Sequence, residues 1–354
     1  MPYAFIMAGG SGTRYWPRSR RKTPKHVVPF GRIGVLLERT VERLVPYFGR
    51  ERVFVISSAE QEDVCRLHLS GLSGENLICE PVGMDSAPCA ALAAALVERW
   101  EPGAVTAMFP ADHLVYPQDG FLRTLDKAVR VAESRGRLVT IGVPPSRPAV
   151  EYGYIRRGAE MEPGVFEVAA FREKPPLEEA RSYLESGDYY WNCGMFVWKA
   201  SRILEETAAF LPATYERVTA IAARWGKEDF ARTFAAEFPH TDRISIDYGV
   251  MEKTSAAAVV EAEFEWDDVG TWPALERHLP RDEEGNVVLG RVVTLDAKNC
   301  IICSEGERLV AVLGMEDAVV VDTPDALLVM PKSEASRVKE LVDKMKREGL
   351  DAYL

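Results

Sequence analysis

Cysteine and histidine are scarce in this 354-residue sequence, which contains six cysteines and five histidines. The cysteines lack the spacing of a disulfide framework, and the pair Cys300 and Cys303 has no second pair or histidine partner for a zinc site. We therefore expect reduced thiols, as in the cytoplasm. Apolar runs long enough to span a membrane are also missing, and the first residues do not resemble a signal peptide. These absences predict a soluble cytoplasmic protein with no membrane partner.

Positive charge is in deficit as well. The formal net charge is −11 at pH 7, which argues against a nucleic-acid partner. One short segment, residues 14–25, reverses this balance because it contains several cations and no acid: Arg14, Arg18, Arg20, Arg21, Lys22 and Lys25. A local basic segment in an acidic protein suits a small anionic substrate, although a solvated basic loop has the same composition.

The sequence does contain a regular alternation of short apolar runs and amphipathic segments before residue 150. We expect buried strands at residues 3–8, 53–57, 105–109 and 138–142, and helices at residues 34–48, 59–70, 86–100 and 119–134. Ser86 is the expected N-cap of the third helix. Further helices are expected at 176–187 and 201–224, within a region of mixed pattern. This alternation predicts an α/β fold, a doubly wound Rossmann-like domain.

The pattern changes after Pro280. Short β-branched runs separated by turn residues fill residues 286–330, with no room for helices between them. An amphipathic helix is expected from Ser333 to Glu348. We therefore predict a catalytic domain at 1–280 and a small β-rich domain of solenoid (β-helix-like) type at 281–354, ending in a helix. Because so few strands leave unpaired edges, we expect this second domain to mediate a homodimer.

A glycine-rich loop follows the first expected strand. Its residues are Ala8, Gly9, Gly10, Ser11, Gly12, Thr13 and Arg14. Glycines let backbone N–H groups approach an anion closely, and so this loop is a candidate phosphate site. It is not the dinucleotide fingerprint, because Tyr15 stands where that motif needs glycine, and it lacks the Gly-Lys-Ser/Thr ending of a Walker loop. A plain tight turn remains the alternative.

The continuation of this loop, Arg14-x-Trp16-Pro17-x-Ser19-Arg20 and then Pro24-Lys25, resembles the sugar-nucleotide pyrophosphorylases, specifically the mannose-1-phosphate guanylyltransferases. The resemblance extends over at least residues 3–275, through several motifs in the family's order. It implies a nucleotidyltransferase fold with a mixed sheet, in which Arg14 and Lys25 neutralise a triphosphate. The family usually has glutamine where this chain has His26, and we assign His26 no chemistry.

Two aspartates are the candidate metal ligands. Asp112 follows an expected parallel strand, at the sheet edge where open α/β sheets bind ligands, although such an aspartate can also cap a turn. Asp268 lies in Trp266-Asp-Asp268-Val-Gly270-Thr-Trp272, which resembles a second acidic motif of the family. The resemblance implies that both residues hold a divalent cation, and their hard oxygen atoms favour Mg²⁺ over zinc.

The resemblance also implies the substrate contacts. Gly153, Glu173 and Asn192 correspond to sugar-binding positions, and Lys174 to the residue that meets the sugar phosphate. A salt-bridged strand pair is the alternative. Gly83, Asp85 and Ser86 fall in the segment that contacts the base in the family. Both regions depart from the family pattern, at Val150 and Glu151 and at Met84, Asp85 and Ser86.

The implied reaction is transfer of GMP from GTP to α-D-mannose 1-phosphate, giving GDP-mannose and pyrophosphate. An alternative is a different sugar 1-phosphate, such as glucose or a heptose, or a different base. A catalytically silent sugar-nucleotide sensor is a second alternative, although it has no need of Arg14, Lys25 and two acidic metal ligands. A fused form that also isomerises mannose 6-phosphate is not expected, because the residues after 270 include only His278 among histidines.

Overall fold

The computed structural model describes residues 1–10, 12–69 and 71–354. Within those residues the largest element is a nine-stranded mixed sheet in the spatial order β3-β2-β1-β4-β9-β6-β10-β8-β7. The strands are β1 (Tyr3–Ala8), β2 (Val53–Ser58), β3 (Leu77–Glu80), β4 (Val105–Pro110), β6 (Leu138–Val143), β7 (Gly153–Glu162), β8 (Val165–Glu173), β9 (Tyr189–Lys199) and β10 (Ala257–Glu261). β1 to β4 pair in parallel, and β9 lies antiparallel between β4 and β6. The predicted mixed sheet is confirmed.

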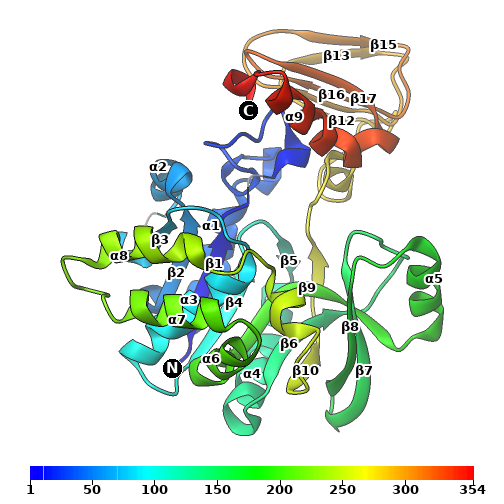
Figure 1. Cartoon of the computed structure of the whole chain (residues 1–354). Coiled ribbons are helices and arrows are strands. Elements are labelled where there is room, and N and C mark those ends of the chain that lie inside the picture. The colour runs from blue at the N-terminus through cyan, green and yellow to red at the C-terminus, as the bar shows by residue number, and fades with distance from the viewer. Residues whose placement is uncertain (11, 70) are drawn as a thin grey trace.

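Helices cover both faces of this sheet (Figure 1). Because side chains alternate along a strand, Ala4 and Ile6 of β1 point into one core and Phe5 into the other. The first core also receives the side chains of α1 (Leu36–Phe48), α2 (Glu62–Leu67), α4 (Gln118–Arg135) and α5 (Leu177–Ser186). The second receives those of α3 (Ser86–Trp100), α6 (Ala200–Phe210), α7 (Pro212–Ala222) and α8 (Phe230–Glu237). The chain is therefore doubly wound, as the sequence predicts.

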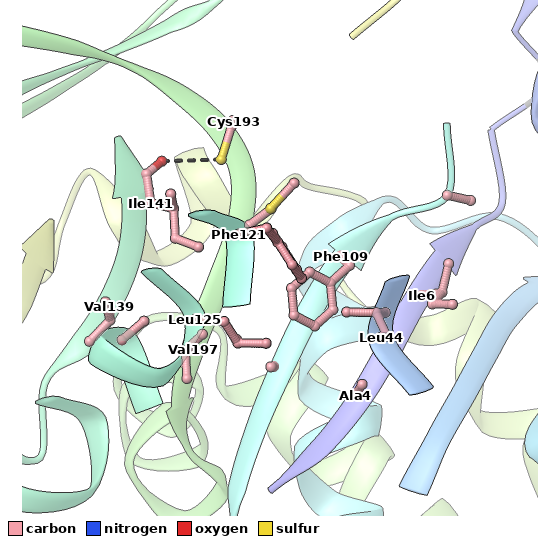
Figure 2. Packing of buried hydrophobic residues seen from close by; sticks show 14 of the residues in the cluster. Ala4, Ile6, Leu44, Phe109, Phe121, Leu125, Val139, Ile141, Cys193 and Val197 are labelled. Atoms are coloured by element: carbon pink, nitrogen blue, oxygen red, sulfur yellow. Dashed lines mark hydrogen bonds between the residues drawn. The ribbon is translucent and has the colours of Figure 1, made fainter. Parts of the chain in front are cut away.

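Figure 2 shows the first core from close by. The rings of Phe109 and Phe121 lie 6.0 Å apart between centroids, and Leu44 of α1 is buried in the same cluster. Cys193 is fully buried there, and its thiol donates a hydrogen bond to the carbonyl oxygen of Ile141 over 3.2 Å. Burial raises the pKa of the Cys193 thiol to about 12, so this cysteine is a structural residue rather than a reactive one.

One helix prediction is wrong in detail. The segment 201–224 forms two helices, α6 and α7, and not one. Leu211 between them has a non-helical φ of −138°, and Pro212 occupies the first turn of α7. Proline lacks the N–H that would continue the preceding helix, but its fixed φ suits a helix start. Among the described helices, none combines the length and the apolar character needed to cross a membrane.

The chain after residue 280 forms stacked coils. Its strands are β12 (Val287–Leu289), β13 (Val292–Leu295), β14 (Ile301–Ser304), β15 (Val310–Leu313), β16 (Ala318–Asp322) and β17 (Leu327–Pro331). β12, β14 and β16 pair in parallel, and β13 pairs in parallel with β15, so successive turns of the chain lie one above the other. β17 closes the stack by antiparallel pairing with β16, and α9 (Val338–Arg347) follows. The predicted β-helix-like domain and terminal helix are confirmed.

A third core joins this β domain to the N-terminal part of the chain. Tyr15, Phe30 and Trp272 are fully buried in one cluster with Val287 and Ile301. Figure 1 shows the same arrangement, with the C-terminal strands and α9 lying against the dark blue segment that follows β1. The β domain is therefore packed on the sheet domain and is not a separate appendage.

Candidate active site

Lys25 lies at the centre of the candidate site. It begins the short helical turn η2 (Lys25–Val27), and its side chain is only 5% exposed. The Lys25 ammonium donates a hydrogen bond to Asp112 Oδ2 over 2.8 Å and another to the main-chain oxygen of Asp268 over 2.6 Å. Three residues that are distant in sequence, all predicted from motifs, are thus brought together around one nitrogen atom.

Strand pairing explains why the two aspartates meet. Asp112 follows β4, and β5 (Leu114–Tyr116) begins two residues later. β5 pairs antiparallel with β11 (Glu265–Asp267), with Leu114 opposite Asp267. Trp266 of β11 also donates its indole N–H to His113 Nδ1 over 3.0 Å. The ladder holds the two acidic motifs side by side, and His113 serves in it as a structural group.

The charge of Asp112 is fixed by its neighbours. Burial by itself raises the pKa of this carboxyl, but Lys25 and His113 outweigh burial and hold the pKa well below its usual range. Asp112 is therefore ionised throughout the neutral range. Burial lowers the pKa of His26 to about 4, and its ring lies against the thiol of Cys65. His26 is consequently a neutral structural residue, in line with the sequence interpretation.

Asp268 is oriented by two donors. The Tyr152 hydroxyl donates to Asp268 Oδ1 over 2.9 Å, and the Gly270 N–H donates to the same oxygen over 3.0 Å. A Cβ at Gly270 would lie 2.5 Å from Asp268 Oδ2, which explains why glycine occupies this position. The neighbouring Asp267 instead pairs with Arg277 over 2.7 Å, so it is a structural acid. Sequence reasoning gave Tyr152 no role, because its partner lies 116 positions away.

The donor atoms at this centre suit a hard divalent cation. No cluster of three or more His, Cys, Asp or Glu side chains that could hold a metal occurs among the described residues. Asp112 and Asp268 therefore supply only two carboxylates, and a cation between them needs further oxygen atoms from a ligand. Mg²⁺ is bound in this way by one or two carboxylates together with substrate phosphates. The residues fit such a cation.

The glycine loop lies beside Lys25. Gly12 adopts a left-handed φ of 61°, and a Cβ at this position would overlap the Cβ of Lys25. Thr13 and Arg14 follow in the helical turn η1 (Thr13–Tyr15), both half-buried. Gly9 and Gly10 are exposed, whereas Ala8 is buried at the end of β1. Ser11, also predicted to contact the nucleotide, lies outside the described residues.

A pocket of about 250 Å³ separates this loop from the start of α3. All three residues of the predicted base segment line it together with two loop glycines: Gly83, Asp85, Ser86, Gly9 and Gly10. The expected N-cap is wrong, because Asp85 caps α3 by accepting from the Ser86 N–H over 2.8 Å. Ser86 Oγ instead accepts from the N–H of Ile246 over 2.9 Å. The helix start is thereby tied to a distant segment.

Glu80 is a further lining residue, to which the sequence analysis gave no role. It ends β3, is 5% exposed, and its Oε1 has no hydrogen-bond partner among the described residues. Burial raises the pKa of Glu80 to about 8. A buried carboxyl oxygen without a donor at the wall of a pocket is costly unless a ligand supplies one. The one signal in the sequence was a charged residue at the end of an otherwise apolar strand.

The predicted sugar-binding residues meet around one glycine. Gly153 of β7 lies opposite Glu173 on one side and Asn192 on the other. A Cβ at Gly153 would collide with the Glu173 carboxylate, so only glycine leaves room for it. Glu173 accepts from Lys174 Nζ over 2.6 Å, and Lys174 has an unusual φ of 48° for a lysine. Such strained backbone is typical of functional sites.

Asp247 joins this cluster from η8 (Asp247–Met251), a π-helical turn. Asn192 donates to Asp247 Oδ1 over 2.9 Å, while the Asn192 amide oxygen accepts from Thr140 and from the Gly194 N–H. The oxygen of Asn192 is thus used within the protein, and its amino group faces the cluster. Burial, and then the negative charge of Glu173, raise the pKa of Asp247 to about 7. Sequence reasoning gave Asp247 no role.

This combination of a glycine loop, a bridging lysine and two aspartates at the edge of a mixed sheet is that of a nucleotidyltransferase. Residues 3–285 match the family described as nucleotidyl transferase, and the chain belongs to this family. Residues 290–345 match the MannoseP isomerase/GMP-like beta-helix domain.

Individual relatives make the comparison more specific. The chain is 39% identical to a mannose-1-phosphate guanylyltransferase of Klebsiella pneumoniae and 38% identical to one of Escherichia coli, in each case over 98% of this chain and 74% of the relative. Among solved structures, a protein described as a mannose-1-phosphate geranyltransferase from Thermus thermophilus is 38% identical. It superposes with a TM-score of 0.86 over 98% of this chain and 99% of that one.

Proposed function

We propose that this chain transfers GMP from GTP to α-D-mannose 1-phosphate, producing GDP-mannose and pyrophosphate. The observation that carries the proposal is the contact of Lys25 with both Asp112 and the main-chain oxygen of Asp268. The names of the relatives at 38% and 39% identity support the choice of guanine and mannose.

In this mechanism the phosphate oxygen of mannose 1-phosphate attacks the α-phosphorus of GTP. A new bond forms between that oxygen and the α-phosphorus, and the bond to the oxygen bridging the α- and β-phosphates breaks. Pyrophosphate leaves with the bonding electron pair. A phosphate is already a competent nucleophile, so no covalent enzyme intermediate is needed. Catalysis then depends on positioning the two substrates and on neutralising charge.

The charged residues have separate tasks in this mechanism. Arg14 and Lys25 neutralise the triphosphate beside the glycine loop, and Lys174 pairs with the sugar phosphate. Asp112 and Asp268 would hold Mg²⁺, which when bound offsets negative charge on the phosphates. Lys25 is the counter-ion of Asp112 here, so its ammonium lies beside the carboxylate that would hold the cation and its bound phosphates. Glu173 and Asn192 contact sugar hydroxyls, with Asn192 as a donor.

Base selection involves Glu80 or Asp85. Guanine presents N1–H and the 2-amino group as adjacent donors, which an ionised carboxylate accepts together. Glu80→Gln is expected to raise the KM for GTP by roughly 10-fold to 100-fold, the value of a lost hydrogen bond to a charged group. The KM for ATP should change little. Asp85→Ala is the variant to compare with it. Sequence reasoning assigned Asp85 to the base, whereas in the structure this residue caps α3.

Steady-state kinetics with both nucleotides separate these assignments. A selective rise of the KM for GTP in Asp85→Ala, with no change of this KM in Glu80→Gln, would assign base recognition to Asp85. Because the pKa of Glu80 is about 8, the parent should bind GTP less tightly as the pH falls from 8 to 6. The carboxylate form is the acceptor, and its population falls by up to about tenfold per pH unit below the pKa. In Glu80→Gln this pH dependence should vanish.

Tyr152 is proposed to orient Asp268. Tyr152→Phe removes the donor to Asp268 Oδ1 and keeps the ring, so kcat should fall by about tenfold, as for one hydrogen bond to a charged group. Tyr154→Phe is the control, because the Tyr154 hydroxyl is buried without a partner among the described residues. Turnover assays with both variants provide the measurement. Equal, small effects in the two variants would contradict the proposed role.

The substrate assignment is tested by a matrix of GTP, ATP, CTP and UTP against several sugar 1-phosphates, scored by pyrophosphate release. The highest kcat/KM is expected for GTP with mannose 1-phosphate. A maximum for another pair would keep the enzyme class and change the substrates. Binding of GDP-mannose without turnover of any pair would favour the alternative of a sensor.

We also propose the domain division at residues 280 and 281 and a homodimer through the C-terminal domain. Several large apolar side chains are exposed on its outer strands and turns, which supports self-association: Val293, Leu295, Leu309, Leu313, Leu327 and Val329. Cytoplasmic location remains part of the same proposal. The mass in solution, measured by light scattering, tests the dimer.

A further inference from the structure

Three arginines of the basic segment, Arg18, Arg20 and Arg21, pair with acids that lie after residue 300. Arg20 pairs with Asp325 through two contacts of 2.8 and 3.2 Å, and Arg21 lies 3.2 Å from Asp351. Arg18 contacts Glu305 in the same way over 3.4 Å. All three acids belong to the β domain or its C-terminal end. The basic segment, which the sequence suggested for an anionic substrate, is largely used to hold this domain.

Apolar contacts reinforce the ion pairs. Trp16 is 7% exposed and donates its indole N–H to the main-chain oxygen of Tyr353 over 2.8 Å. Tyr15 and Trp16 belong to the core that also contains Ile301 and Val342. The outer side of the segment between Gly12 and Lys25, meaning the side that carries Trp16 and the three arginines, is therefore held on the β domain by ion pairs and by buried apolar contacts.

The inner side of the same segment carries the catalytic groups. Ser19 Oγ donates to the main-chain oxygen of Gly12 over 2.6 Å, and the Tyr15 hydroxyl donates to the oxygen of Thr271 over 2.6 Å. Gly12 in turn packs directly on Lys25. Ser19 directly precedes Arg20, so these contacts connect the arginine-bearing stretch to Lys25 through Gly12. A shift of the outer side would thus displace Lys25 from Asp112.

We infer that the C-terminal β domain positions residues 12–25, and that the Arg20–Asp325 pair is a positioning contact for the Lys25 ammonium. The β domain thereby acts in the reaction without touching substrate. This inference rests on the proposed transferase function. The alternative is that Arg20 itself binds a phosphate. The burial of its side chain to 15% exposure and its two contacts to Asp325 favour the positioning role.

Charge reversal tests the inference. Asp325→Arg places two cations in contact, and Arg20→Asp places two anions in contact, an arrangement that costs more than a simple deletion. Each single variant should lower kcat/KM for the nucleotide by about tenfold, with kcat also reduced, and the double exchange R20D with D325R should restore most of it. Arg337→Ala is the control, because Arg337 is 62% exposed and, within the part of the chain that the structure describes, pairs only with Glu334 and Glu340.

The exchange distinguishes the two roles of Arg20. If Arg20 binds a phosphate directly, Asp325→Arg will have little effect and the double exchange will stay as impaired as Arg20→Asp. That result would overturn the inference. The ratios are measured with whichever nucleotide and sugar 1-phosphate the parent uses best, so failure of the guanine or mannose assignment does not affect them.

Hydrogen–deuterium exchange supplies a readout that needs no activity. The amide hydrogens of residues 12–25 should exchange faster in both single variants than in the parent. In the R20D/D325R double variant and in Arg337→Ala they should exchange at the parental rate. Thermal unfolding identifies any variant that has lost its fold. Unchanged exchange of this segment in a folded Asp325→Arg protein would also overturn the inference.

Discussion

Asp112→Asn and Asp268→Asn are each expected to reduce turnover by about 100-fold or more, in line with removal of other groups that stabilise transition-state charge. Asparagine keeps the shape of aspartate and removes its charge, so the fold should survive. Because both carboxylates act on the same phosphates, the double variant should lose much less than the product of the two single losses. Pyrophosphate release at several Mg²⁺ concentrations provides the measurement.

The control for these two variants is Asp267→Asn, which changes the residue next to Asp268. Asp267 pairs with Arg277 and His278, and its pKa is low because these partners outweigh the effect of burial. This change should destabilise the protein while leaving the Mg²⁺ dependence of the remaining activity as in the parent. Activity within a few-fold of the parent in Asp112→Asn or Asp268→Asn, with unchanged Mg²⁺ dependence, would refute the assignment.

Truncation after Leu279 is expected to give a chain that aggregates or changes its oligomeric state. The β domain covers Tyr15, Phe30 and Trp272, all fully buried, and its removal exposes them together. Large exposed apolar patches of this kind promote association. Size-exclusion chromatography with light scattering measures the outcome. A truncated chain that stays soluble, keeps the parental oligomeric state and is fully active would contradict both this prediction and the role of the β domain.

A milder variant separates packing from self-association. Ile301→Ala in the shared core should lower the free energy of unfolding by about 2–5 kcal/mol, the usual cost of a buried isoleucine, without changing the mass of the assembly. Leu295→Ala is the matched surface variant, since Leu295 is 63% exposed. It should leave the unfolding of the subunit nearly unchanged, and a dimer through the outer strands predicts that it weakens association.

Local signals in the sequence were sufficient for much of the fold. Buried parallel strands are continuous apolar runs, and α3 is a run of alanines, so the doubly wound order was predictable. The break between α6 and α7 was missed although Pro212 is a local signal for it, since proline cannot donate the N–H that would continue α6. The β domain was recognisable from its closely spaced β-branched strands.

The motifs of the site could be recognised without a structure, because Arg14, Lys25, Asp112 and Asp268 occur in short patterns that resemble a family. The partners of the other charged residues became evident from the fold alone. Arg20 meets an acid 305 positions away, and among the described residues the Oε1 atom of Glu80 has no hydrogen-bond partner at a pocket. The physical reason is that ion pairing and burial depend on distances in space, and residues far apart in sequence carry no local signal of which partner they meet.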